Sequence, residues 1–183
     1  MKQSPFDQLR AEHHVVRRAL VVLANLADHV SLGGSFPARD VELVMRFFNE
    51  FFQGVHEVKE LQSLYPAVAL HGNDREAELA GGLLRDHADT VDIFHSLALF
   101  AEPSSELSDV EVAGFADAAR AFVGRLRRHL QEEETALFPI AEACVPPDDQ
   151  LSMLEVFHEL DSGLSATACW STELQELEAT WGS

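Results

Sequence analysis

The sequence predicts an all-α protein, an up-down four-helix bundle with a short additional C-terminal helix. Three observations lead to this fold class. Apolar residues recur at helical spacing over four long segments, and no segment alternates between apolar and polar residues as a β-strand would. The connections between the segments are about ten residues or shorter, which is typical of antiparallel neighbours. The 183 residues, 46% of them apolar, suffice for one domain with a substantial core.

The first two predicted helices have clear ends. The first covers about residues 4–30 and stops at a Gly-Gly pair, since glycine adopts the positive φ that a helix end often needs. The second begins between Pro37 and Asp40 and extends to about Tyr65, with phenylalanines at helical spacing. Pro66 lacks a backbone N–H, so we expect the second helix to kink or end there.

Three more helices are predicted in the rest of the chain. The third covers about residues 75–100 and is closed by Pro103. Ser-Asp-Val-Glu at 108–111 is a capping box that opens the fourth, which ends before a Pro-Pro pair. A shorter helix covers about residues 149–160, followed by a tail to which no structure is assigned. We therefore expect a bundle domain over residues 1–146 and a C-terminal helix and tail over residues 147–183 that pack on it.

The net charge of the chain limits the class of partner. Thirty-one acidic and 13 basic residues give a formal charge of −18. Such a chain is repelled by nucleic acids and anionic membranes, so neither is an expected partner, whereas cations suit it. No secretory signal or membrane-spanning segment is apparent, and only Cys144 and Cys169 carry thiols. Two free thiols in a reducing cytoplasm are favoured over one disulfide, so we expect a cytoplasmic protein, monomeric or homodimeric.

The sequence contains an internal repeat. A His-x3-Glu-x4-Tyr-Pro segment beginning at His56 matches a His-x3-Glu-x4-Phe-Pro segment beginning at His129, at an offset of 73 residues. An acid–His pair ending at His13 matches the pair ending at His87 at an offset of 74, which selects His13 over its neighbour His14. Each half thus contributes one helix with an acid–His pair and one with His-x3-Glu.

The spacing of these residues favours metal binding. Residues four apart share a helix face, so each His-x3-Glu pair presents an imidazole and a carboxylate to one point. Buried carboxylates require compensating positive charge, which one or two dications would supply. Mixed nitrogen and oxygen donors without thiolate suit iron or manganese, and they outnumber the needs of one tetrahedral zinc. The candidate ligands are His13, His56, Glu60, His87, His129 and Glu133, with Glu60 and Glu133 bridging two iron ions.

This set of helix-borne residues resembles the hemerythrin family, specifically the hemerythrin-like HHE cation-binding domain, over roughly residues 6–144. The resemblance implies a non-haem di-iron centre in the bundle, with two iron ions (Fe2+/Fe3+) joined by an oxo or hydroxo bridge and held by the six residues above. Manganese or zinc is less expected.

One position departs from the family pattern. Hemerythrin uses a fifth histidine four residues after the one matching His87, and here that position is Val91. The departure argues against simple reversible oxygen carriage. Glu57, which follows His56 directly, is a further candidate ligand, since some family members use an acid at this place. Water or an exogenous ligand could equally fill the position.

The predicted metal site is compatible with two classes of function, and a third interpretation has no metal at all. The first is a di-iron protein that binds or reacts with dioxygen, peroxide or nitric oxide, with catalase-like, peroxidase-like or oxidase-like turnover as its enzymatic version. No catalytic residue separate from the metal ligands is indicated. The second is an iron or oxygen sensor, or an iron-handling module, without turnover. A metal-free structural bundle is the third interpretation.

Overall fold

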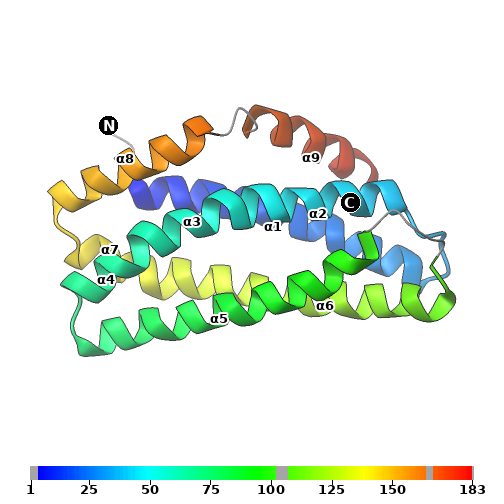
Figure 1. Cartoon of the computed structure of the whole chain (residues 1–183), viewed down its shortest axis with the longest axis horizontal. Helices are drawn as coiled ribbons and strands as arrows, with labels where there is room; N and C mark the ends of the chain where they lie inside the picture. The colour runs from blue at the N-terminus through cyan, green and yellow to red at the C-terminus, as the bar shows by residue number, and fades with distance from the viewer. Residues whose placement is uncertain (1–3, 102–106, 164–166, 183) are drawn as a thin grey trace.

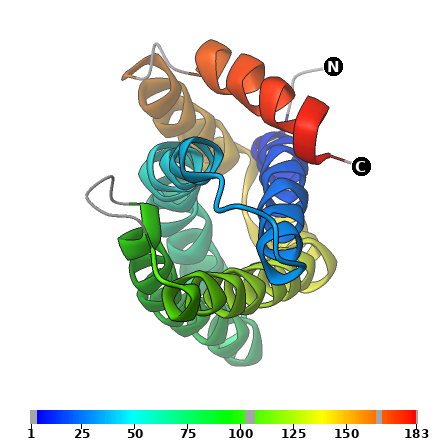
Figure 2. The same cartoon turned by 90° about the vertical axis from the view of Figure 1, so that its right-hand side faces the viewer.

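Four long helical rods lie side by side along the length of the molecule and enclose a common core (Figures 1 and 2). The computed structural model describes residues 4–101, 107–163 and 167–182, and within these ranges every regular element is helical. The predicted all-α bundle is therefore confirmed. The expectation that Pro103 closes the third helix falls outside the described residues.

The rods are built as follows. The first is α1 (Pro5–Ser31). The second consists of α2 (Ala38–Phe47), the π-helical segment η1 (Phe48–His56), α3 (Glu57–Lys59), the π-helical segment η2 (Glu60–Leu64) and α4 (Tyr65–His71). The third is α5 (Asp74–Ala98) with the 3-10 turn η3 (Leu99–Ala101). The fourth consists of α6 (Asp109–Glu132), the π-helical segment η4 (Glu133–Leu137) and α7 (Phe138–Cys144).

Local sequence signals fix several helix ends. Ser4, Asn73 and Ser108 each accept a backbone N–H with their side chains, and each takes part in a capping box at the start of α1, α5 and α6. Gly33 follows α1 with φ of +87°, a conformation that disfavours residues with a Cβ. The predicted ends of these helices therefore rest on ordinary capping chemistry.

The second helix does not end at Pro66, so of the two outcomes expected there, a kink or an end, the end is excluded. It continues to His71, with Pro66 in the first turn of α4. The backbone N–H of Tyr65 donates to the carbonyl of Glu60, five residues earlier, so the turn before the proline is wider than an α-helical turn. This wide turn accommodates a residue that cannot donate to the regular helical ladder.

The sequence repeat is also a repeat of backbone structure. The segments η2 and α4 (residues 60–71) correspond to η4 and α7 (residues 133–144) at the same offset of 73. In both copies, the residue before the proline donates its N–H to the glutamate carbonyl five residues earlier. Turns of π-helix are rare overall, but those that occur are frequently found at functional sites. Their presence in both copies of the repeat therefore indicates that the two His-x3-Glu segments are functional.

The core consists of two apolar clusters with a polar layer between them. One cluster contains Phe48, Phe122 and their neighbours, and the other contains Phe6, Phe138 and Phe157. On every rod, the predicted ligands fall between residues of the two clusters along the chain. On α1, for instance, His13 lies between Leu9 of one cluster and Val16 of the other.

Two further helices, α8 (Pro147–Gly163) and α9 (Thr167–Trp181), lie along one side of the bundle against α1 and the second rod (Figures 1 and 2). The segment after the predicted short helix, to which the sequence assigned no structure, thus forms α9. Leu174 and Leu177 of α9 are buried in one apolar cluster, and Phe157 of α8 is buried in the other. Among the described residues, no helix is both long enough and apolar enough to span a membrane.

Burial of α9 predicts that its apolar face stabilises the whole fold. Leu174 is 1% exposed, so we expect Leu174→Ala to lower the free energy of unfolding by about 2–5 kcal/mol in urea denaturation. Leu151→Ala is the matched control, because Leu151 on α8 is 46% exposed, and a change below about 0.5 kcal/mol is expected. Equal effects of the two substitutions would contradict the packing of α9.

Candidate metal centre

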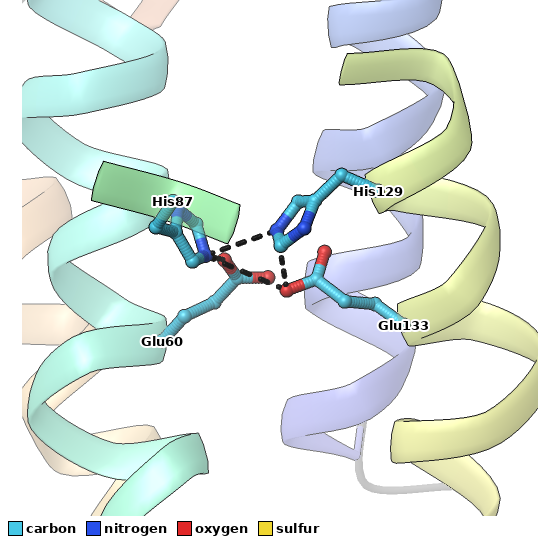
Figure 3. Close-up of side chains that lie close together, drawn as sticks. All are labelled: Glu60, His87, His129 and Glu133. Carbon is cyan, nitrogen blue, oxygen red and sulfur yellow. Dashed lines mark hydrogen bonds and ion pairs between the residues drawn. The ribbon is translucent and has the colours of Figure 1, made fainter. Parts of the chain in front are cut away.

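Six predicted side chains from all four rods meet in the polar layer of the core. Their exposed fractions do not exceed 3%, which is exceptional for charged groups. Figure 3 shows four of them pointing toward one another from the second, third and fourth rods. The six are His13, His56, Glu60, His87, His129 and Glu133. The structure thus brings together every candidate ligand of the repeat, while His14, next to His13, is exposed.

The donor atoms form two groups that share one carboxylate. Each group has one ligand atom per residue, all within 4.8 Å of one another. The first group contains Glu60, His87, His129 and Glu133, and the second contains His13, His56 and Glu60. Two adjacent cation positions with Glu60 between them are therefore geometrically available.

Glu60 and Glu133 each face both histidine pairs. Oε1 of Glu60 lies 3.2 Å from Nε2 of His56, and its Oε2 lies 3.3 Å from Nε2 of His87. Oε1 of Glu133 lies 3.1 Å from Nε2 of His129, and its Oε2 lies 3.4 Å from Nε2 of His13. Each carboxylate thus contacts one histidine of each pair, although only Glu60 belongs to both groups of converging donor atoms.

Several of these buried atoms lie 3.2–3.4 Å from a group of opposite charge but make no hydrogen bond within the described part of the chain. They include Nε2 of His56, Oε2 of Glu60 and Oε2 of Glu133. An unpaired polar atom in a protein interior is costly, so the protein alone leaves this layer incompletely satisfied. Nitrogen and oxygen lone pairs directed at a common point are what a cation requires. The residues present therefore fit a metal centre.

Three of the histidines contact a further carboxylate with Nδ1, the ring nitrogen that faces away from the converging donor atoms. Nδ1 of His56 lies 2.9 Å from Oε2 of Glu12, and Nδ1 of His13 lies 3.0 Å from Oε1 of Glu134. Nδ1 of His87 lies 2.9 Å from Oε1 of Glu57. A carboxylate at Nδ1 holds a proton there and leaves Nε2 free to bind a metal, which fixes both the tautomer and the ring orientation.

Glu57 is therefore not placed among the converging donor atoms. Its carboxylate contacts Nδ1 of His87, whereas Nε2 of His87 faces Glu60 and Glu133. The supporting carboxylates Glu12 and Glu134 were not predicted as site residues. The sequence does carry a signal for each: Glu12 is the acid of the repeated acid–His pair that ends at His13, and Glu134 directly follows Glu133.

Tyr65 is another site residue whose role the sequence did not reveal. Its hydroxyl donates a hydrogen bond of 2.5 Å to Oε1 of Glu133, and its ring packs edge-on against His87. The equivalent residue in the other half is Phe138, whose ring lies 5.2 Å from that of His13 but carries no hydroxyl. One bridging carboxylate thus receives a phenolic hydrogen bond that has no counterpart in the other half of the repeat.

The electrostatics of the layer favour charged histidines in the metal-free protein. Burial opposes protonation of His56, but attraction to Glu60 and the hydrogen bond to Glu12 outweigh it and raise the pKa of His56 to about 9. Burial likewise opposes protonation of His87, yet the close carboxylates of Glu133, Glu57 and Glu60 raise its pKa to about 12. Burial also raises the pKa of Glu133, but His129 and the other imidazoles hold it well below its ordinary value.

The fold and the site together define a helical-bundle cation-binding protein. A family model of the hemerythrin HHE cation-binding domain matches residues 4–141, well over half of the chain. The chain therefore belongs to the hemerythrin HHE cation-binding family, as the resemblance of its motifs indicated. A comparison with curated proteins found no match. The helices α8 and α9 lie outside the residues that the family model covers.

The raised pKa of His56 predicts how the stability of the metal-free protein depends on pH. Between about pH 6.5 and 9 the folded state retains a proton on His56 that the unfolded chain releases. This contribution is complete below about pH 6.5 and is lost as the pH rises through about 9, so the free energy of unfolding falls over this range. Urea denaturation at several pH values measures it.

The matched variants are His56→Gln and His14→Gln. The first removes one of the titrating groups and should reduce the slope over this pH range without abolishing it, because the raised pKa of His87 also contributes. The second changes an exposed histidine and should leave the slope unchanged. A slope that is the same in all three proteins would contradict the assignment to His56.

Proposed function

We propose that this protein is a non-haem di-iron protein that binds or reacts with dioxygen or a related small oxidant such as peroxide or nitric oxide. The observation that carries the proposal is the position of two buried carboxylates between two histidine pairs. His87 and His129 would bind one ion, and His13 and His56 the other, with Glu60 and Glu133 shared between them. Membership of the family supports metal binding at this layer.

The chemistry of the donors favours iron over the alternatives. Zinc in proteins is usually four-coordinate, whereas this layer offers six side-chain ligands, four imidazoles and two carboxylates. Structural zinc sites also commonly contain thiolate ligands, and this layer has none. Manganese prefers a larger share of oxygen ligands than this layer provides. When bound, iron would supply the electrons that reduction of dioxygen or peroxide requires.

The surroundings of the layer support reactivity more than simple storage of dioxygen. The supporting carboxylates of Glu12, Glu57 and Glu134 add negative charge next to the histidines, and only Lys59 and Arg17 oppose it at these contacts. Carboxylate–histidine pairs increase the basicity of the ligands, which stabilises the more highly charged state of a metal. A centre that favours its oxidised state is a poor reversible carrier.

The remaining residues control access and proton position. The apolar clusters on both sides of the layer exclude bulk water from it, and the Tyr65 hydroxyl holds a proton at Oε1 of Glu133. Val91 is half-buried on α5, one turn after His87 and on the same face. It places an apolar side chain where a fifth histidine ligand would stand, which leaves room for water or an exogenous ligand at one ion.

The proposal predicts two iron ions per chain and a specific pattern of loss. After anaerobic loading with Fe2+ and removal of excess metal, we expect two equivalents in the wild-type protein and one in His13→Ala. The matched control is His14→Ala, because the neighbouring exposed histidine should not affect the count. Elemental analysis and the optical spectrum of the oxidised protein measure it, and equal metal content in the two variants would contradict the ligand assignment.

Peroxide turnover distinguishes an enzyme from a carrier. If the enzymatic version is correct, iron-loaded protein given hydrogen peroxide should evolve oxygen faster than the same amount of free iron. Val91→His should reduce this rate, on the order of tenfold, because the added imidazole occupies the available ligand position. A rate no higher than that of free iron would exclude the catalase-like version, and an undiminished rate in Val91→His would show that this position is not used.

A sensor or iron-handling role is the second proposal, and it rests on a different observation. The candidate ligands come from all four rods, so metal binding and folding are thermodynamically linked. In this case chelation of the metal should lower the melting temperature while peroxide turnover stays absent.

A further inference from the structure

A fully buried lysine connects the metal centre to a helix outside the family domain. Lys59 lies between the predicted ligands His56 and Glu60 in sequence, and its side chain has no exposed surface. Lysine is rarely buried to this extent unless it is paired. Its ammonium group lies 2.5 Å from Oε1 of Glu12 on α1 and 2.5 Å from Oδ1 of Asp161 on α8.

The contacts of Glu12 extend this connection to a metal ligand. While Oε1 of Glu12 accepts a hydrogen bond from Lys59, its Oε2 lies 2.9 Å from Nδ1 of His56. The same carboxylate that holds the His56 ring is therefore itself held by Lys59. An unbroken series of short contacts runs from Asp161 through Lys59 and Glu12 to His56.

The other side chains around this series keep it in a single arrangement. Nε2 of Gln8 donates to Oδ2 of Asp161 at 2.8 Å, and the Lys59 ammonium lies 5.4 Å from the centre of the Phe157 ring on α8. Asp161 thus uses both carboxylate oxygens. Asp161 is 36% exposed, but it is one of the two carboxylates that contact the fully buried Lys59 ammonium. Removing its charge leaves that ammonium with Glu12 alone, so the position of Lys59 and Glu12 depends in part on Asp161.

We propose that Asp161 is a positioning residue for the metal centre, and that it acts through Lys59 and Glu12 on the orientation of His56. The helix α8, which carries Asp161, then contributes to metal binding. The inference rests on the metal site proposed above, but it adds a residue that the family domain does not contain. Binding at the His13–His56 position and docking of α8 are coupled, and the coupling is reciprocal. The His87–His129 position has no equivalent connection among the described residues.

The experiment is a titration of the full-length protein with Fe2+ under anaerobic conditions against a competing chelator. Asp161→Asn keeps the shape of the side chain and removes its charge. We expect it to weaken binding of one of the two equivalents about tenfold and to leave the other unchanged. Asp148→Asn, an exposed aspartate on the same helix, is the matched control and should bind both equivalents as the wild type does.

Two further measurements separate positioning from a general loss of stability. In a His13→Ala background only the His87–His129 equivalent remains, and Asp161→Asn should not change its affinity. Asp161→Glu, which keeps the charge, should recover part of the lost affinity. Hydrogen exchange gives the reciprocal readout, since metal should slow exchange of the α8 amides in wild type and Asp148→Asn more than in Asp161→Asn.

The outcomes have distinct meanings. A wild-type protein that binds fewer than two equivalents overturns the proposed di-iron site, and this inference with it. Two equivalents in wild type, with equal affinities in Asp161→Asn and Asp148→Asn, overturn only the role of Asp161. Equal weakening of both equivalents in Asp161→Asn also overturns it, because a general structural effect would not select one position.

Discussion

Two carboxylates in the middle of an apolar bundle are the constraint on which the rest of the structure depends. Glu60 and Glu133 have no exposed surface, and their charges must be compensated inside the protein. Without metal, protonated histidines do this, as the raised pKa values of His56 and His87 indicate. Metal ions would replace these protons, because imidazole must give up a proton to bind a metal. Protonated histidines in the metal-free protein and metal ions in the loaded one would therefore compensate the same two carboxylates.

The candidate ligands are duplicated in the two halves of the repeat, but the residues that contact those ligands are not. Glu57, which supports His87, corresponds to the apolar Leu130 at the offset of 73, and Glu134, which supports His13, corresponds to Leu61. Nδ1 of His129 has no hydrogen-bond partner among the described residues, while its counterpart in His56 contacts Glu12. The two candidate metal positions are consequently unequal in charge and support, and such an unequal pair would suit the binding of an exogenous ligand at one of them.

Helical periodicity, the repeat and the local signal at Ser108 allowed the four-helix bundle, one of the three capping boxes and the convergence of the ligand candidates to be predicted. These features are local in sequence or follow from the three- and four-residue spacing of one helix face. The supporting contacts could not be predicted, because each joins different rods: Glu12 contacts His56, and Tyr65 contacts Glu133. The π-helical turns were missed for another reason. Periodicity assumes one helical pitch, so Pro66 read as a helix breaker although a wider turn admits it.

The position of α8 changes what counts as the functional unit of this chain. A family domain that ends at residue 141 contains every candidate metal ligand, yet Lys59 within it needs Asp161 from beyond it. Without Asp161 the buried ammonium would keep only Glu12 as its anionic partner, and a shift of Lys59 would be passed to Glu12, because the two side chains are hydrogen-bonded. Since His56 is oriented by that carboxylate, the geometry at one ion depends on a helix that the family pattern does not describe. Ligand motifs alone therefore do not specify the properties of the centre, and members of the family with the same ligands but different C-terminal helices should differ in metal affinity at this position.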